Sequence, residues 1–363
     1  MAKEKSGNSG AIASLLLFLF SYSIMFNSVF SFGTELAVVF LAAGAYFLWN
    51  KNSHILSCLF FGLASTTSLL SLLPITTIIA MVFLSSKRDF MKLSSAFFAV
   101  FLFVNGLFFA VSGDGYLNQV YRFHLLKSYS GAENFSEYMD IAKLNWILFL
   151  SAALFVFVKE KKQMGVFAEV SVIYLVFLIL LKKIFGFYFL ITFPFLAVMG
   201  GCSLIRIFDS LSSSKRLRVC ISLAFLSVFM WNLAADVHFL NKIGFAGFER
   251  GKDLADFVAS NSDKNTMLFG DDSAVPLIAL LTGKKIAFDS ADTNNQVFTT
   301  GLLSLKNTLA SLKGKDVMFI IRSTQGISQF SEVRDFLNEN CEFLSRFHDK
   351  TEGSYLVYRC SPT

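Results

Sequence analysis

The stretch from residue 217 to residue 261 reads LRVCISLAFLSVFMWNLAADVHFLNKIGFAGFERGKDLADFVASN. Its first half, up to Val237, is apolar and long enough to cross the ~30 Å hydrocarbon core of a bilayer as a helix. Its second half carries charged residues at intervals typical of an amphipathic helix on a globular domain. The chain therefore changes here from a membrane domain, residues 1–238, to a soluble domain, residues 239–363.

The composition of the chain supports the same division. Hydrophobic residues make up 54% of the chain and charged residues only 16%, and the mean hydropathy is +0.58. These values differ strongly from those of soluble domains and predict a polytopic α-helical membrane protein. The net charge is +6, but the basic residues cluster in short loops between apolar runs, as cytoplasmic anchors do. We therefore expect no nucleic acid partner.

About nine apolar stretches are candidates for transmembrane helices. The first is too long for the core of a signal peptide, so we expect it to be retained. Two stretches meet at Pro74 and form either two spans or one re-entrant unit, which leaves a total of eight open. The nine stretches are 11–32, 35–50, 54–70, 74–86, 92–112, 142–158, 165–181, 187–206 and 217–237.

Lysine and arginine predict the orientation of these spans. With nine spans and a cytoplasmic amino terminus, thirteen basic residues fall on the cytoplasmic side and five on the outer side before the soluble domain. This bias follows the positive-inside rule. It predicts an integral protein of the cell membrane whose C-terminal domain is extracytoplasmic.

The soluble domain alternates helix and strand signals. Phe248–Asn261 and Ser331–Asn340 have the pattern of amphipathic helices, and Asp316–Arg322 contains a strongly apolar strand. This alternation predicts a small α/β domain with a largely parallel sheet, in which Lys285–Phe288 forms a further strand. The last predicted element is a hairpin within residues 342–359. The domain has no glycine-rich phosphate loop, so nucleotide binding is not expected.

Two pairs of residues in the soluble domain are candidates for disulfide or metal chemistry. Cys341 and Cys360 flank the hairpin, where antiparallel pairing places them opposite each other on an extracytoplasmic domain. They form either a disulfide or two unpaired strand cysteines. Asp271 and Asp272 do not predict a metal site, because adjacent carboxylates point in different directions and the four histidines are scattered.

The predicted outer loop from Ser112 to Ile141 carries many polar side chains. It contains Asp114 and, further along, Arg122, His124 and Lys127. In a helix His124 and Lys127 share a face, and apolar positions alternate with basic ones, so a helix lying on the membrane would present cations to a lipid phosphate. The alternative is an interfacial helix whose basic residues only reach the headgroups.

Glu35 and two lysines are the other candidates in the membrane domain. Glu35 begins a span at the outer face, where a carboxylate is costly unless it is wet or paired. It is either functional or a helix N-terminal carboxylate with Thr34 as a nearby cap. Lys182 and Lys183 lie on the outer side, against the charge bias, and precede Tyr188. They either bind a phosphate or anchor the chain at the interface.

Several short segments follow one another in a recognisable order. They are Thr34-Glu35, residues 62–68 ahead of Leu73-Pro74, Tyr121–Lys127, residues 187–197 with Gly200-Gly201, and, in the soluble domain, Phe269–Asp272, Pro276, residues 279–283 and Asp292–Asn294. In this order and topology they resemble the C-terminal two-thirds of an integral-membrane GT-C glycosyltransferase. This class includes protein O-mannosyltransferases and aminoarabinose transferases. The resemblance spans most of the chain.

The resemblance implies a transferase that uses a polyprenyl-phosphate-linked sugar on the outer face of the membrane. In such enzymes basic side chains hold the lipid phosphate, and a carboxylate takes a proton from the acceptor while the phosphate leaves the anomeric carbon. Glu35 resembles a carboxylate of such a site. The residues that the resemblance assigns to the phosphate are Arg122, His124, Lys127, Lys182, Lys183 and Tyr188.

The chain departs from this class at its first loop. Members usually carry the catalytic aspartate on a long outer loop after the first helix, whereas only Gly33-Thr34 separates the first two predicted spans here. The chain is then expected to be a truncated product, one half of a split enzyme whose partner subunit supplies the missing N-terminal half, or a degenerate non-catalytic relative. If it acts alone, the general base is Glu35 or Asp114. No cofactor is expected of the chain itself, and a divalent metal is expected only with such an acidic loop.

Two other classes of function compete with the transferase. A non-catalytic membrane scaffold, whose external domain binds a partner or a glycan, has the same topology. A lipid or solute transporter usually shows internal repeats and broken or polar helices near mid-membrane. The sequence has no convincing repeat, and its spans are polar mainly at serine and threonine, so the transporter is disfavoured.

Overall fold

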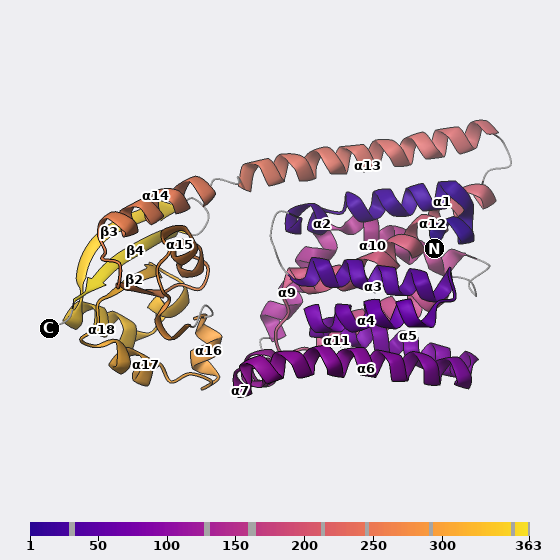
Figure 1. Cartoon of the computed structure of the whole chain (residues 1–363). Coiled ribbons are helices and arrows are strands. Elements are labelled where there is room, and N and C mark those ends of the chain that lie inside the picture. The colour runs from indigo at the N-terminus through magenta and orange to yellow at the C-terminus, as the bar shows by residue number, and fades with distance from the viewer. Residues whose placement is uncertain are drawn as a thin grey trace. The chain divides into compact units, whose positions relative to one another are not determined.

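The computed structural model describes residues 1–28, 33–126, 131–158, 165–211, 215–243, 247–289, 293–349 and 353–361 of the chain. The chain divides into two compact units. The first unit contains Met1–Tyr116 and Tyr129–His238, and the second contains Leu117–Ser128 and Phe239–Thr363. In Figure 1 the first unit is a bundle of helices and the second is a small sheet with helices around it.

The first unit is built from helices that pack along one another. Helix α3 packs along α4, α4 along α6, and α1 along α12. Three short elements, α7 (Asp114–Leu117), η2 (Asn118–Arg122) and α8 (Phe123–Leu126), follow α6 in the chain. The other elements are α1 (Ala2–Leu19), α2 (Tyr22–Asn27), α3 (Gly33–Trp49), α4 (His54–Thr67), η1 (Leu69–Ser71), α5 (Leu72–Ser85), α6 (Lys87–Ser112), α9 (Gly131–Leu144), α10 (Trp146–Ala153), η3 (Leu154–Phe157), α11 (Gly165–Leu180), η4 (Gly186–Thr192), α12 (Phe193–Leu211) and α13 (Lys215–Ile243).

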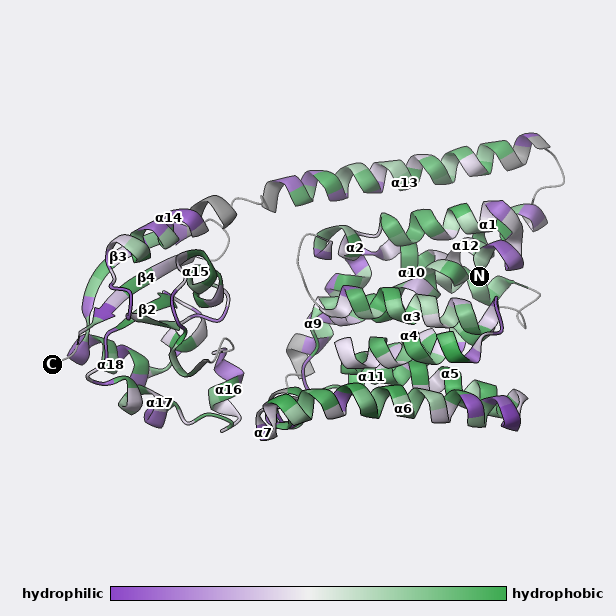
Figure 2. Cartoon of the chain, viewed as in Figure 1, coloured by the Kyte–Doolittle hydropathy of each residue, from purple (hydrophilic) through white to green (hydrophobic). Residues whose placement is uncertain are grey.

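The helices identify an integral membrane protein. Within the described residues, three helices are long and apolar enough to cross a membrane: Lys87–Ser112, Gly186–Ser210 and Val219–Asn241. A fourth candidate is the pair Asn134–Leu144 and Trp146–Phe157, which is bent by 84°. Figure 2 shows apolar residues along most of α3, α4, α5 and α6, with hydrophilic residues at the first turn of α6. The total of nine spans and the orientation of the termini stay predictions.

The span that continues into α12 forms the centre of the first unit. Of the most apolar 18-residue stretch of this span, 94% is buried inside the protein. The corresponding stretches of α6 and α13 are 6% and 11% buried. Gly201 in α12 lies directly against the backbone of Ser14 in α1, so a side chain at this position would collide with it. Small residues at helix crossings allow such close approach in a bilayer. Helices α6 and α13 instead present apolar side chains to the surroundings.

The structure corrects the boundaries of the first predicted span, 11–32. Helix α1 begins at Ala2 and ends at Leu19, and Ser21 has extended backbone geometry before α2 begins. The Ser21 hydroxyl donates a hydrogen bond to the carbonyl of Phe18 (3.0 Å) and satisfies a group that the helix leaves unpaired. Hydropathy does not register this break because the residues on both sides of it are apolar.

The second unit contains a mixed sheet. Strands β1 (Met267–Gly270), β2 (Val317–Arg322), β3 (Glu342–Asp349) and β4 (Gly353–Cys360) follow the order β1-β2-β4-β3. Only β1 and β2 pair in parallel, because the C-terminal hairpin inserts β4 beside β2. The predicted largely parallel sheet is therefore wrong. The predicted strand Lys285–Phe288 is reduced to an isolated bridge at Ile286, since Phe288 has a φ of 61° and turns the chain away.

Strand β2 is the centre of the second unit. Val317, Phe319 and Ile321 belong to the core cluster with α17 and α18, whereas Met318 and Ile320 belong to the cluster with α14 and α15. Burial on both faces explains why this strand is a continuous apolar run rather than an alternating one. The helices are α14 (Gly247–Ser260), α15 (Val275–Thr282), η5 (Ala287–Asp289), α16 (Asn295–Thr299), α17 (Leu305–Leu312), η6 (Gly326–Gln329) and α18 (Ser331–Asn340).

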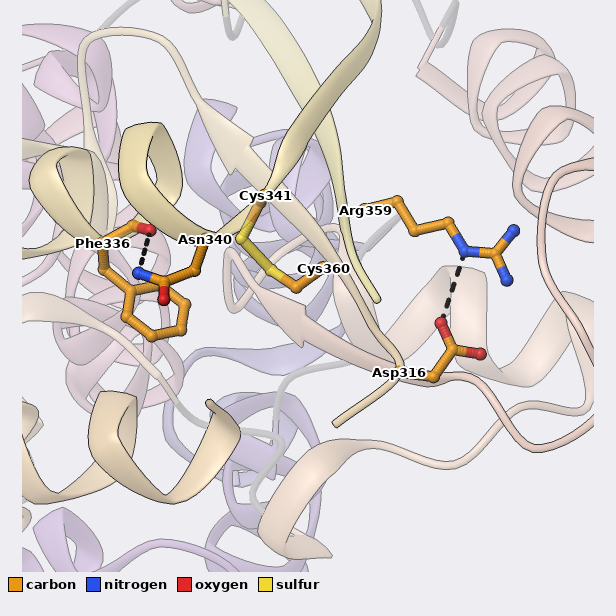
Figure 3. The surroundings of a disulfide bond; sticks show 6 residues. All are labelled: Asp316, Phe336, Asn340, Cys341, Arg359 and Cys360. Atoms are coloured by element: carbon orange, nitrogen blue, oxygen red, sulfur yellow. Dashed lines mark hydrogen bonds and ion pairs between the residues drawn. A yellow bond between two sulfur atoms is a disulfide. The ribbon is translucent and has the colours of Figure 1, made fainter. Parts of the chain in front are cut away.

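A disulfide joins Cys341 and Cys360 at the end of the hairpin (Figure 3). Beside it, the guanidinium of Arg359 donates hydrogen bonds to Asp316 (3.3 Å) and Asp263 (2.8 Å). Burial lowers the pKa of Arg359, but the carboxylates of Asp263 and Asp316 raise it by more. The pKa of Arg359 is therefore above its ordinary value. The disulfide therefore ties the end of β4 to the residue between α18 and β3, and the ionic cluster ties it to the residues that precede β1 and β2.

Candidate functional site at the Glu35 end

Four elements meet at one end of the first unit, which we call the Glu35 end. The start of α3 contacts η1, and η4 contacts α3, η1 and α9. Gly33, the first residue of α3, faces the carbonyl of Thr67 at the end of α4, and a Cβ at Gly33 would lie 2.9 Å from that oxygen. Two 3₁₀ segments therefore lie beside the first turn of α3, which carries Glu35.

The carboxylate of Glu35 is removed from solvent. Both of its oxygen atoms are buried, and its neighbour Thr34 is 5% exposed. The positive end of the helix dipole favours an anion in the first turn. Burial of a carboxylate is nevertheless expensive unless polar groups compensate for the lost water. The burial of both oxygen atoms is compatible with either role predicted for Glu35, that of a functional carboxylate or that of a helix N-terminal carboxylate.

Helix α9 holds the loop that precedes η4 through Asn134. The side-chain nitrogen of Asn134 donates to the carbonyls of Leu181 (2.8 Å) and Lys182 (3.3 Å), and its side-chain oxygen accepts from the N–H of Ile184 (2.9 Å). This loop is not helical, so its backbone groups need partners from outside the segment. We call this set of hydrogen bonds the Asn134 clamp. It fixes the backbone that carries Lys182 and Lys183.

Lys183 lies against an aromatic ring. Lys182 is exposed, whereas Lys183 is half-buried and its Nζ lies 5.7 Å from the centre of the Phe185 ring. This geometry is that of a cation–π interaction. Tyr188 packs edge-on against Phe185 with ring centroids 5.5 Å apart. Its backbone carbonyl accepts a hydrogen bond from the hydroxyl of Tyr174 (2.8 Å), so Tyr188 is a buried member of this end rather than a surface group.

The sequence analysis missed a second carboxylate, that of Glu137. Its Oε1 atom lies beside Gly186, the first residue of η4, and a Cβ at Gly186 would lie 2.9 Å from it. The next residue, Tyr138, packs edge-on against Phe189 with centroids 5.0 Å apart. Glu137 follows Asn134 by three residues, so both lie on one face of α9. That spacing was visible in the sequence, but nothing there indicated which face of this helix meets η4.

Asn145 fixes the bend between α9 and α10. Its side-chain nitrogen donates to the hydroxyl of Ser23 (2.7 Å) and to the carbonyl of Ile141 (2.9 Å), and its side-chain oxygen accepts from the N–H of Ser23 (3.0 Å). Asn27 adds a hydrogen bond to the carbonyl of Ser23 (2.7 Å). All four hydrogen bonds are buried, and together they tie α2 to the bend.

The remaining predicted site residues belong to other segments of the chain. Asp114 is exposed at the start of α7, and Arg122 is exposed at the end of η2, within residues 117–128 that cluster with the second unit. The backbone of His124 belongs to α8, but its side chain and the whole of Lys127 lie outside the described residues. Of the predicted residues, Glu35 lies on α3 and Tyr188 on η4, which contact each other, and Lys182 and Lys183 lie on the loop that precedes η4.

In the second unit the adjacent carboxylates of Asp271 and Asp272 pair with Arg322. Arg322 Nε donates to Asp271 Oδ2 (2.6 Å), and its Nη2 lies 3.7 Å from Asp272. The other oxygen of Asp271 accepts from the N–H (3.0 Å) and the hydroxyl (2.5 Å) of Ser273. Asp271 is 1% exposed, so these contacts satisfy a buried carboxylate. In the part of the chain that the structure describes, no group of three or more His, Cys, Asp or Glu residues could hold a metal ion.

No protein-family model matches the sequence, and no curated protein matches it. The structure, in contrast, is similar to the crystal structure of ArnT from Cupriavidus metallidurans, a GT-C aminoarabinose transferase, bound to undecaprenyl phosphate. The TM-score is 0.62, and the similarity covers 98% of this chain and 80% of that chain at 12% sequence identity. The fold is GT-C-like. The resemblance that the order of the sequence segments indicated is thereby confirmed.

Proposed function

We propose that this protein is a membrane glycosyltransferase that moves a sugar from a polyprenyl phosphate to an acceptor. The observation that carries the proposal is the extent of the structural similarity, which includes the helices and the soluble unit of this chain and relates it to ArnT bound to undecaprenyl phosphate. We place the reaction at the Glu35 end. The predicted orientation of the spans makes this the outer face of the membrane.

Lys182 and Lys183 are the proposed binding groups for the lipid phosphate. They lie on a loop whose backbone is held by the Asn134 clamp, and Lys183 rests on the ring of Phe185. When the bond between the sugar and the phosphate breaks, the phosphate oxygen gains negative charge. Cations that are already oriented near a low-dielectric region stabilise that charge more in the transition state than water does.

Glu35 is the proposed general base. The acceptor hydroxyl or amine attacks the anomeric carbon, its proton passes to the Glu35 carboxylate, and the polyprenyl phosphate leaves with the bonding electron pair. A single displacement of this kind inverts the anomeric configuration. Glu137 is the second candidate for this role, because its Oε1 atom lies beside Gly186 at the start of η4. A base in this position requires a buried carboxylate close to the segment that binds phosphate.

Replacing Glu35 by Gln tests the proposal. The variant keeps the shape of the side chain and removes the proton acceptor, so we expect turnover to fall by roughly a hundredfold or more. The assay is the release of undecaprenyl phosphate from undecaprenyl-phosphate-linked aminoarabinose, mannose or glucose by the purified full chain in nanodiscs. Glu169→Gln is the matched control, because Glu169 is exposed on α11. We expect this control to leave turnover unchanged.

Two outcomes would contradict this assignment. If Glu35→Gln keeps full turnover while Glu137→Gln abolishes it, the base is Glu137. If the wild-type protein releases no undecaprenyl phosphate from any donor but still binds this lipid or a glycan, the protein is a scaffold. The thermal unfolding temperature of each variant is measured in parallel, so that a loss of turnover through misfolding is recognised.

The lysine pair is tested by affinity. We expect the double variant Lys182→Ala/Lys183→Ala to bind undecaprenyl phosphate about tenfold more weakly, because hydrogen bonds to charged groups contribute about 1.5–3 kcal/mol. Binding is measured by native mass spectrometry in nanodiscs. Lys143→Ala is the control, since Lys143 is 69% exposed and pairs with Asp140 at 3.4 Å. Equal affinity of the double variant and the control would remove this loop from the site.

A further inference from the structure

Strand β1 is an edge of the sheet in the second unit, and exposed apolar side chains lie beside it on both faces. Apart from one isolated bridge, the order β1-β2-β4-β3 leaves one side of β1 without a neighbouring strand. On the face of Leu268, helix α15 ends with Leu280 and Leu281, which are 80% and 45% exposed. On the face of Phe269, the ring of Phe288 packs edge-on at 6.3 Å and is 49% exposed.

The ring of Phe288 is held at the surface together with a cation. Phe288 has a φ of 61°, in the left-handed region that bulky side chains rarely adopt. Its neighbour Ala287 is buried, so the turn places one residue inside and the large ring outside. The Nζ atom of Lys315 lies 5.7 Å from the centre of the ring. A strained turn of this kind persists only where its surroundings fix it.

Three exposed lysines lie at the same end of β1. The carbonyl of Lys285 accepts a hydrogen bond from the N–H of Leu268 (2.8 Å), which places Lys285 directly beside the strand. Lys313 and Lys315 belong to the turn before β2, where Gly314 has a φ of 74°. This turn also lies beside β1, because β1 and β2 pair in parallel.

The carboxylates near these lysines have another partner. Asp316 follows Lys315 directly and accepts a hydrogen bond from Arg359 (3.3 Å), and Asp263 accepts a second one from the same guanidinium (2.8 Å). The ion pairs within the described part of the chain include none of the three lysines. This edge of the unit is therefore positively charged as well as apolar.

We propose that this edge docks on the bilayer surface, with its lysines among anionic phospholipid headgroups and its apolar side chains at the boundary of the acyl chains. Lysine and aromatic side chains are the usual anchors at this depth of a membrane. The attraction of lysine to anionic headgroups adds to the burial of apolar area. We call this surface the lysine edge, and it consists of Leu280, Leu281, Lys285, Phe288, Lys313 and Lys315.

The order of the chain supports a membrane as the partner. The second unit follows a candidate membrane span, since α13 ends at Ile243 and α14 begins at Gly247. The short connection gives the unit a high effective concentration at the membrane surface. A soluble polyanion would neutralise the lysines but leave Leu280 and Phe288 in water, whereas a bilayer surface accommodates both kinds of side chain.

The test is the distance of the lysine edge from lipid headgroups. Leu281→Cys is labelled with bimane in a Cys220→Ser background, because Cys58 and Cys202 are buried and Cys220 is exposed. The full chain is placed in phosphatidylglycerol nanodiscs that contain a small fraction of lipid with a nitroxide on its headgroup. We expect this label to be quenched about threefold more than a label on Leu303→Cys, which is also partly exposed in the second unit. Equal quenching of the two labels would overturn the proposal.

Reversing the charge of the lysines separates docking from chance proximity. The triple variant Lys285→Glu/Lys313→Glu/Lys315→Glu should reduce quenching of the label at position 281 to the level at position 303. Lys306→Glu is the matched control, because Lys306 is exposed at the start of α17, and it should leave quenching unchanged. Undiminished quenching in a folded triple variant would assign the lysines to protecting an edge strand and refute the proposal.

Two further measurements keep the proposal testable if the triple variant does not fold. Leu280→Ser keeps every charge and should reduce quenching about twofold, because it removes part of the apolar area. Replacing phosphatidylglycerol by phosphatidylcholine should reduce quenching of the unaltered lysine edge to the control level. Equal quenching in the two lipids would contradict the role of the lysines. The proposal concerns the placement of the second unit and does not depend on the transfer reaction proposed above.

Discussion

The two ends of the first unit hold their chain together by different means. At the Glu35 end helices break, and the side-chain amides of Asn134 and Asn145 replace backbone hydrogen bonds that the breaks remove. At the opposite end, which we call the His54 end, α6 begins with a simple cap in which Ser86 accepts from the N–H of Asp89 (3.3 Å). There Asp89 also lies 3.5 Å from the ring nitrogen of His54.

This difference indicates where the protein tolerates irregular backbone. Inside a membrane, non-helical segments occur only where other groups satisfy their N–H and C=O groups. The Glu35 end meets that requirement with the buried amides of Asn134 and Asn145, whereas at the His54 end the described turns between α3 and α4 and between α5 and α6 are short. The buried amides thus lie at the end at which we propose the site.

The largest loss of stability is expected for Asn145→Leu. The substitution leaves the N–H and the hydroxyl of Ser23 without their partner, and each unsatisfied buried group costs about 1–3 kcal/mol. We expect the free energy of unfolding to fall by about 3 kcal/mol, measured by thermal unfolding in nanodiscs. Asn241→Leu on the exposed end of α13 is the control. An unchanged unfolding temperature for Asn145→Leu would show that the amide does not stabilise the bend.

For Asn134→Ala we expect a smaller loss of stability than for Asn145→Leu but a larger loss of affinity for undecaprenyl phosphate. Without the Asn134 clamp the loop from Leu181 to Ile184 loses its fixed geometry, so we expect affinity for undecaprenyl phosphate to fall about fivefold. The unfolding free energy should fall by about 1–2 kcal/mol, because the freed groups lie closer to the surface. Asn145→Leu, compared per folded molecule, should keep its affinity. If both variants lose stability and affinity in the same ratio, the clamp has no positioning role.

The smallest effect is expected for Asp89→Asn at the His54 end. A partly exposed ion pair and an N-terminal carboxylate together contribute about 1 kcal/mol or less. Turnover and affinity for undecaprenyl phosphate should stay at the wild-type level. A loss of turnover in this variant would show that the two ends are coupled and would remove the distinction drawn between them.

The sequence predicted the elements of this protein better than their connections. The apolar runs found the helices, but the break at Ser21 lies inside apolar surroundings, where hydropathy is insensitive to it. In the second unit the strand Val317–Arg322 was recognised, whereas the mixed order of the sheet was not. Strand order depends on which edges pair, and a single sequence contains no direct signal of that pairing.

The candidate site shows the same division. Glu35, Lys182 and Lys183 were visible because charge next to an apolar run is unusual, and this local signal needs no structure. Glu137 and the Asn134 clamp could not be recognised in the sequence, because their significance depends on which face of α9 meets η4.

The sequence by itself therefore determined that the chain is a membrane protein with a less apolar C-terminal part, because hydropathy is a property of consecutive residues. It also indicated the GT-C resemblance through the order of short segments. Only the tertiary structure decided which polar groups share an end of the bundle, how the sheet is ordered, and that exposed lysines and apolar side chains gather around β1. These features depend on contacts between residues far apart in the chain, and packing alone sets those contacts.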